Sequence, residues 1–99
     1  MRVTARSTLI KFYEQSGYRD AKGPLEAWYA EAKHAEWKTP ADVKAKYGNA
    51  SILADNRVVF NTGGNKYRLV VKIHYNTGIV YIRFVGTHAD YDAIDVERI

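Results

Sequence analysis

The stretch that decides the fold is residues 61–92, NTGGNKYRLVVKIHYNTGIVYIRFVGTHADYD. Lys66–Tyr75 is rich in β-branched and aromatic residues and therefore predicts a long strand. Ile79–Val85 has the same character and predicts a partner strand. The Asn-Thr-Gly triplet at 76–78 is typical of a tight turn, because glycine accepts a positive φ without strain. Together the two runs predict an antiparallel hairpin.

A short helix is expected directly after this hairpin. Thr87 can cap the first amides, and Asp90, three residues later, can return the hydrogen bond, which makes a capping box. His88 then lies in the first turn, and Tyr91 lies on nearly the same helix face. A histidine and a phenol are thus predicted side by side where the second strand ends.

Upstream, Arg57–Asn61 predicts a third strand, and the Thr-Gly-Gly-Asn turn at 62–65 joins it to the long strand. Met1–Ala5 alternates weakly and is expected to add a strand at one edge, while Ser51–Leu53 is a brief extended stretch. The sheet is therefore predicted to be antiparallel, with three to four strands.

The first half of the chain is expected to be helical. Ser7 and Thr39 carry hydroxyls that can cap the free amides of a first turn, and Pro40 suits the position after such a cap. An i, i+3, i+4, i+7 stripe, typical of a core-facing side, is formed by Leu25, Trp28, Tyr29 and Ala32. The expected helices are Ser7–Gln15, Pro24 to Ala35 or Trp37, and Pro40–Tyr47.

This order of elements predicts the α+β class: two to three N-terminal helices packed on a twisted antiparallel sheet of three to four strands, with a short C-terminal helix. A chain of 99 residues is expected to make one domain, covering residues 1–99. It has no cysteine, which suits the cytoplasm and leaves no thiolate metal site. No apolar run reaches the roughly 18 residues of a membrane span, and the first residues do not resemble a secretory signal.

The net charge is +4 and the isoelectric point about 9.4, which favours polyanions and above all nucleic acid. Alternation along the hairpin places the charges on one face. The residues expected in the core are Leu69, Val71, Ile73, Ile82 and Phe84. The residues expected on the face that the helices leave open are Lys66, Arg68, Lys72, Tyr81 and Arg83. Such a face can hold a phosphate chain while a base stacks, although an ordinary solvated sheet has the same composition.

His88 carries an imidazole, a side chain that can act as a general acid or base or can serve the structure alone. His34 and His74 are too far from it in sequence to have metal-ligand spacing, and we expect no metal or cofactor. The carboxylates near the C-terminus are expected to be solvated: Asp90, Asp92, Asp95 and Glu97. From its residues alone the chain is a small basic α+β domain that faces RNA.

Two segments, VVFNTGGNKYRLVVKI at 58–73 and VYIRFVGTHADYDAID at 80–95, resemble the HigB-type branch of the RelE-like toxins, the messenger RNA interferases. The Trp-Tyr-Ala and Trp-Lys-Thr-Pro-Ala-Asp segments of the helical half are also similar to this branch. The resemblance implies a cytoplasmic toxin of a type II toxin–antitoxin system. It implies cleavage of mRNA on the ribosome, and neutralisation by a HigA-like antitoxin whose helix-turn-helix domain makes the only link to DNA.

The resemblance also implies roles for residues. Arg68 matches the phosphate-stabilising arginine, Arg83 a second cationic contact and His88 the general acid or base. Tyr91 matches a stacking or proton-transfer position, and Lys66 falls where some relatives carry a catalytic lysine. Further contacts to RNA are expected from Lys72, Tyr81 and Asn65.

The implied reaction needs no metal: the 2′-hydroxyl attacks the adjacent phosphate, cations hold the developing charge, and an acid protonates the leaving 5′-oxygen. Which of His88, Lys66 and Tyr91 is the base and which the acid stays open. One rival function is a non-catalytic RNA- or ribosome-binding module that uses the same face. The other is an interaction domain whose sheet face is inert.

Overall fold

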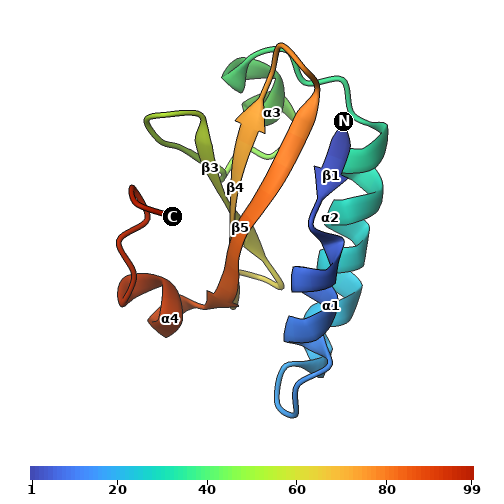
Figure 1. Ribbon diagram of the computed structural model, residues 1–99. Helices are drawn as coiled ribbons and strands as arrows, with labels where there is room; N and C mark the ends of the chain where they lie inside the picture. Colours follow the sequence, from blue (N-terminus) through green and yellow to red (C-terminus); the bar gives the residue numbers. More distant parts are fainter.

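The computed structural model describes residues 1–99 and places its two longest helices, α1 and α2, on one side of a twisted sheet and the short helix α4 on the other (Figure 1). The helices are α1 (Arg6–Tyr13), the 3-10 helix η1 (Arg19–Ala21), α2 (Lys22–His34), α3 (Pro40–Lys46) and α4 (His88–Asp92). The strands are β1 (Arg2–Thr4), β2 (Ser51–Ile52), β3 (Arg57–Thr62), β4 (Tyr67–His74) and β5 (Ile79–Thr87). The predicted α+β class is confirmed. No helix of the chain combines the length and the apolar character that crossing a membrane requires.

The sheet has five strands in the order β1-β5-β4-β3-β2, one more than expected, because the brief extended stretch at 51–52 also pairs. β2 to β5 are antiparallel, as predicted, but β1 runs parallel to β5. The purely antiparallel prediction was therefore wrong for this edge. A three-residue pattern holds no information about the direction of a partner almost eighty residues away, as the register Arg2 to Ile79 illustrates.

The helix ends confirm one predicted cap and correct another. Thr39 caps α3, its hydroxyl accepting from the amide of Asp42 at 3.3 Å, and the Asp42 carboxylate completes the capping box. Ser7 is not a cap, because α1 begins one residue earlier and its N-cap, Ala5, has no side-chain bond. The helix expected to start at Pro24 starts two residues earlier, at Lys22, directly after η1. Pro24 therefore lies within the first turn, where the backbone N–H groups have no partner in the helix and a missing N–H costs nothing.

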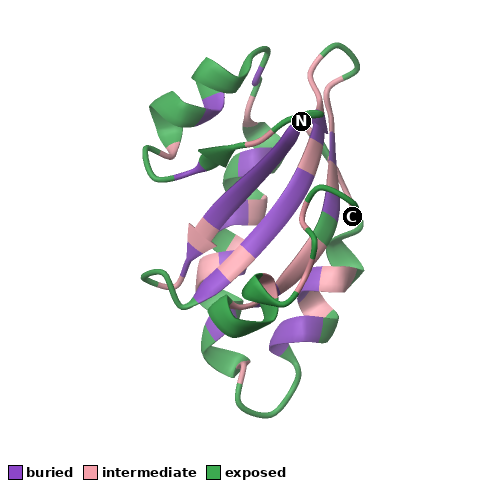
Figure 2. Ribbon diagram, turned by 90° about the vertical axis from the view of Figure 1, so that its left-hand side faces the viewer, coloured by how far each residue is buried: buried purple, intermediate pink, exposed green.

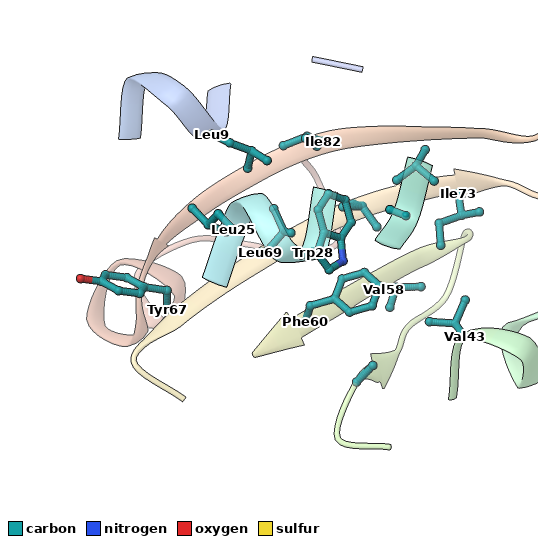
Figure 3. Close-up of a cluster of buried hydrophobic side chains, with 14 of the residues drawn as sticks. Leu9, Leu25, Trp28, Val43, Val58, Phe60, Tyr67, Leu69, Ile73 and Ile82 are labelled. Atoms are coloured by element: carbon teal, nitrogen blue, oxygen red, sulfur yellow. The ribbon is translucent and has the colours of Figure 1, made fainter. Parts of the chain in front are cut away.

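The main core lies between the helices and the sheet, where 18 buried residues form one cluster (Figure 3). Leu25, Trp28 and Ala32 of the predicted stripe are buried in it, while Tyr29 packs at its margin. Across the layer, the rings of Trp28 and Phe60 lie 5.4 Å apart in an edge-on arrangement, a favourable aromatic geometry. The expected core residues of β4 and β5 that belong to the cluster are Leu69, Val71, Ile73 and Ile82.

Phe84 is not part of that core, and a β-bulge in β5 explains the difference. Val71 pairs with Ile82 but Val70 pairs with Phe84, so Arg83 is the extra residue and has no partner on β4. A bulge shifts the alternation by one residue. Beyond it Val85, not Phe84, packs against the core cluster.

We call the sheet face turned away from α1 and α2 the outer face. Reading across the paired strands, it carries Arg57, Val59, Asn61, Arg68, Val70, Lys72, Tyr81 and Phe84. This face was expected to be open, but α4 and residues 93–99 lie in front of it (Figures 1 and 2). Val59 and Val70 are buried there although neither belongs to the main cluster. Arg57 is only 8% exposed, and its Nε donates to the backbone oxygen of Ile99 at 2.8 Å.

Candidate active site

Strand register brings the main candidate residues to one end of the sheet. Arg68 of β4 lies opposite Gly86 of β5, and Tyr67 lies opposite Thr87, the last residue of that strand. His88 follows immediately as the first residue of α4. Because directly opposed Cα atoms in antiparallel strands are about 5 Å apart, the backbones that carry Arg68 and His88 are close neighbours.

The predicted capping box fixes the position of His88. The amide of Asp90 donates to the Thr87 hydroxyl at 3.1 Å, and the amide of Thr87 donates to the Asp90 carboxylate at 3.1 Å. The His88 side chain is 61% exposed, and its Nε2 lies 3.6 Å from Oδ1 of Asp92. Tyr91 follows on the same short helix and is half-buried.

Asp92 is a neighbour of His88 that was not singled out from the sequence, where it was assigned to a solvated acidic run, and its side chain is indeed exposed. The signal was present, because residues at i and i+4 face each other on a helix and 88 and 92 have this spacing. A carboxylate beside an imidazole can orient the ring and stabilise its protonated form. The pair therefore has the groups needed for acid–base chemistry at an exposed surface.

Arg68 and Arg83 supply cationic groups whose charge is not neutralised. The guanidinium of Arg68 donates to the backbone oxygen of Asn65 at 2.7 Å. Arg83 is exposed at the bulge, about 10 Å along the strand from Gly86 at ordinary strand rise. Neither guanidinium lies within ion-pair distance of a carboxylate. Both can therefore receive an anionic ligand without first breaking an internal pair.

Lys72 and Tyr81 lie opposite each other on the outer face, as predicted, but at a distance from this end of the sheet. Lys72 is four positions along the strand from Arg68, which corresponds to about 13 Å. The Lys72 ammonium lies 3.4 Å from the Asp55 carboxylate, and the Tyr81 ring packs edge-on against His74 at 4.9 Å. Hydrogen bonds, first from Arg57 and then from Lys72, lower the pKa of Asp55. The positive charges of Arg57 and Lys72 are therefore already balanced by the Asp55 carboxylate.

Lys66 does not project from the outer face, and that prediction was wrong. It lies in the turn before β4, and its Nζ pairs with Asp20 of η1 at 2.5 Å. The hydrogen bond to Asp20 raises the pKa of Lys66, so the amine stays protonated at neutral pH. In this position Lys66 can act as a cation or donor but is poorly suited to be a general base.

Phe84 is a second residue of this region that alternation placed elsewhere. A Cβ built on Gly86 would lie 2.7 Å from Cζ of Phe84 and 3.0 Å from Cβ of Asp90. The ring therefore covers Gly86, and only glycine allows α4 to start so close to it. Its place on the outer face near Arg68 gives the site a partly exposed aromatic surface.

No group of three or more histidine, cysteine, aspartate or glutamate side chains comes close enough together to hold a metal ion. The arrangement that remains is two unneutralised guanidiniums, an exposed histidine with a carboxylate beside it, and a phenol. Such a set can bind a phosphodiester and move protons on either side of it.

A family model described as HigB_toxin, RelE-like toxic component of a toxin-antitoxin system, matches residues 21–94. The chain belongs to this family. Among curated proteins, it is similar to the mRNA interferase toxin HigB of Escherichia coli strain K12, with 36% identity over 58 residues. The mRNA interferases HigB of Escherichia coli O157:H7 and Shigella flexneri show the same 36% identity over 58 residues. Each match covers 57% of this chain and spans about half of the relative, 56% of its length.

Proposed function

We propose that this protein is the toxin of a type II toxin–antitoxin system and acts as an mRNA endoribonuclease. The single observation that carries the proposal is the placement of Arg68 and His88 at the same end of the sheet, with Arg68 opposite Gly86 and His88 two residues beyond it. Membership of the HigB toxin family and the similarity to mRNA interferases support messenger RNA as the proposed substrate class.

In the proposed reaction the 2′-hydroxyl of the RNA attacks the adjacent phosphorus. The O2′–P bond forms while the P–O5′ bond breaks, which yields a 2′,3′-cyclic phosphate and a 5′-hydroxyl end. Arg68 and Arg83 hold the phosphate and the negative charge that develops on its oxygens. Removing such a preorganised donor typically costs about 10² to 10³ in rate.

Two protons must move in this step: one leaves the 2′-hydroxyl and one reaches the departing 5′-oxygen. His88, with Asp92 beside it at 3.6 Å, is the proposed group for one of these transfers, and Tyr91 is the candidate for the other or for base stacking. The raised pKa of Lys66 argues against its being the base, and its partner Asp20 holds it on the helical side. No metal ion takes part in the proposed step.

The proposed site is an exposed surface of arginines and a histidine rather than an enclosed pocket, and such a surface suits a polymer presented by a larger partner. We therefore propose that cleavage depends on the ribosome, which holds mRNA extended. The proposed inhibitory partner is a HigA-like antitoxin with a helix-turn-helix domain, through which the complex reaches DNA. The net charge of +4 favours an acidic segment on that antitoxin.

The rival function is a non-catalytic RNA- or ribosome-binding module. Unneutralised arginines favour it as much as they favour a nuclease, since both must bind phosphate. His88 discriminates between the two, because proton transfer is needed for cleavage and not for binding.

The test is growth after tightly controlled induction, combined with primer extension on one abundant transcript. Wild type is compared with His88→Ala and Arg68→Ala, and with exposed controls near the opposite end of β5, His34→Ala and Arg2→Ala. Growth arrest with new cleavage ends in wild type and both controls, but in neither site variant, supports the nuclease and its site. Arrest without new ends favours the binding module, and ends that persist in His88→Ala place the chemistry elsewhere.

A further inference from the structure

Asp20 joins the helical layer to the end of the sheet where the candidate site lies. One carboxylate oxygen pairs with the ammonium of Lys66, and the other accepts a short hydrogen bond from the hydroxyl of Tyr67. Hydrogen bonds from Lys66 and then Tyr67 lower the pKa of Asp20, so the carboxylate is ionised across the neutral range. A residue of η1 thus holds two consecutive residues that are more than forty positions away in sequence.

The turn between β3 and β4 rests on the same tyrosine. Gly63 has a φ of +60°, and a Cβ at this position would lie 3.2 Å from Cδ2 of Tyr67 and 3.8 Å from Pro24 of α2. The amide of Lys66 donates to the oxygen of Gly63 at 3.2 Å, which closes the turn. The backbone of residues 63–66 therefore packs against the Tyr67 ring, and the ion pair of Lys66 with Asp20 links it to η1.

Residues 63–66 also position the side chain of Arg68. The backbone oxygen of Asn65, a residue with a φ of +73°, accepts from the Arg68 guanidinium at 2.7 Å. That is the only hydrogen bond of the Arg68 side chain to the rest of the chain. A shift of the turn would therefore move the acceptor that fixes the arginine.

We propose that Asp20 is a positioning residue for the site: by clamping Lys66 and Tyr67 it fixes the 63–66 turn, and through the Asn65 carbonyl it fixes the guanidinium of Arg68. The proposal rests on the proposed function for its catalytic consequence. It also gives Lys66 a role as a tie between the layers in place of a role in the chemistry.

The tyrosine ring has a second support, which separates positioning from simple stability. Tyr67 packs edge-on against Phe12 at 5.5 Å and Tyr18 at 6.3 Å, and those two rings stack on each other at 4.7 Å. These contacts hold the ring in the core without Asp20. The carboxylate adds the link from that core to the turn, so its loss should affect the turn more than the fold.

The chain offers a matched control. Glu31 of α2 also accepts a short hydrogen bond from a tyrosine, Tyr47, and lies 4.0 Å from a lysine, Lys46, but it touches neither the turn nor the site. Asp20→Asn and Glu31→Gln therefore remove the same kind of charge from the same kind of cluster. The measurements are the single-turnover rate and substrate affinity for RNA cleavage on ribosomes, and amide hydrogen exchange over residues 63–68.

For Asp20→Asn we expect faster exchange at the amides of 63–68 and a loss of about tenfold in cleavage rate, with substrate affinity changed much less, because a misplaced charge weakens the transition state most. Glu31→Gln should change neither the rate nor exchange in the turn. In an Arg68→Ala background Asp20→Asn should cause no further loss, since its effect passes through that arginine.

Three results would overturn the proposal. They are unchanged amide exchange in the turn of Asp20→Asn, an unchanged cleavage rate in that variant, or a double variant with Arg68→Ala whose rate loss is the full product of the two single losses. If the wild-type protein cleaves no RNA, it is the proposed function that fails. The exchange comparison still decides whether Asp20 fixes the turn.

Discussion

On the face of β4 that meets the helices, Leu69, Val71 and Ile73 are completely buried in one apolar cluster. On the outer face of the same strand, Val70 is buried beneath a different part of the chain, while Arg68 and Lys72 keep partial exposure. The outer face is itself divided. Lys72 is paired with Asp55, whereas Arg68, four positions away, forms no ion pair with a carboxylate. The helix-covered face of β4 is thus continuous and apolar. Along the outer face, a cation paired with a carboxylate, Lys72, is followed by one without such a partner, Arg68.

This difference separates stability from chemistry. A continuous apolar layer stabilises through area removed from water and tolerates no charge. An arginine without an internal partner contributes little to folding but is available to a phosphate. Substitutions on the two faces of β4 should therefore separate into those that unfold the protein and those that inactivate it.

The largest expected effect is on the helix-covered face. Leu69→Ala leaves a cavity in a core position with no exposure and should lower the free energy of unfolding by about 2–5 kcal/mol. Urea denaturation followed by circular dichroism measures it. Ile52→Ala, at a residue that is 38% exposed on the edge strand, is the control and should cost far less. Equal losses at both positions would contradict the assignment of the core.

On the outer face the expected effect is on activity. Arg68→Ala should lower the cleavage rate by about 10² to 10³ while the denaturation midpoint changes little. Lys72→Ala, on the same face of the same strand, should have a smaller effect on the rate, because its charge is already shared with Asp55. A loss in Lys72→Ala as large as that in Arg68→Ala would show that the two halves of the outer face do not differ.

Much of the fold could be predicted because its signals are local. The long hairpin follows from β-branched residues and its turn, and the Thr39 and Thr87 capping boxes each lie within four residues. Alternation gave the correct face for the helix-covered residues of β4. It failed only after Arg83, because the bulge at that residue adds one position that no feature of the sequence marks, and so moves Phe84 to the other face.

The candidate site was predictable in position but not in its connections. Arg68 and His88 lie at the same end of the sheet because the register of one hairpin places them there, and a hairpin is a short-range feature. Lys66 was misplaced because its partner Asp20 lies 46 residues earlier, and a turn residue has no fixed face. The cover on the outer face was missed for the same reason, since nothing in residues 93–99 indicates that Ile99 reaches Arg57.

The contact between Phe84 and Gly86 predicts the next effect. Gly86→Ala places a methyl 2.7 Å from the Phe84 ring and should destabilise the protein by about 1–3 kcal/mol. Combining it with Phe84→Leu should recover part of that loss, since the closest approach is to the tip of the ring and the approach to Cβ of Asp90 at 3.0 Å remains. Thermal unfolding of the two single variants and the double variant tests this coupling, and strictly additive losses would contradict it.

The smallest expected effect is the pH dependence of the neutralised half. The folded-state pKa of Asp55 is lowered, first by the hydrogen bond from Arg57 at 2.9 Å and then by Lys72. A lowered carboxyl pKa contributes stability that is complete above the ordinary value of about 4 and is lost as the pH falls through the folded value. When the pH is lowered from about 5 to about 2, the melting temperature of wild type should therefore fall more than that of Asp55→Asn. Because the carboxylate is well exposed, the difference should be small and should shrink further in high salt. Parallel melting curves for the two proteins would mean that Asp55 does not neutralise Lys72 in solution, and Lys72 would then belong with Arg68 as a free cation on the outer face.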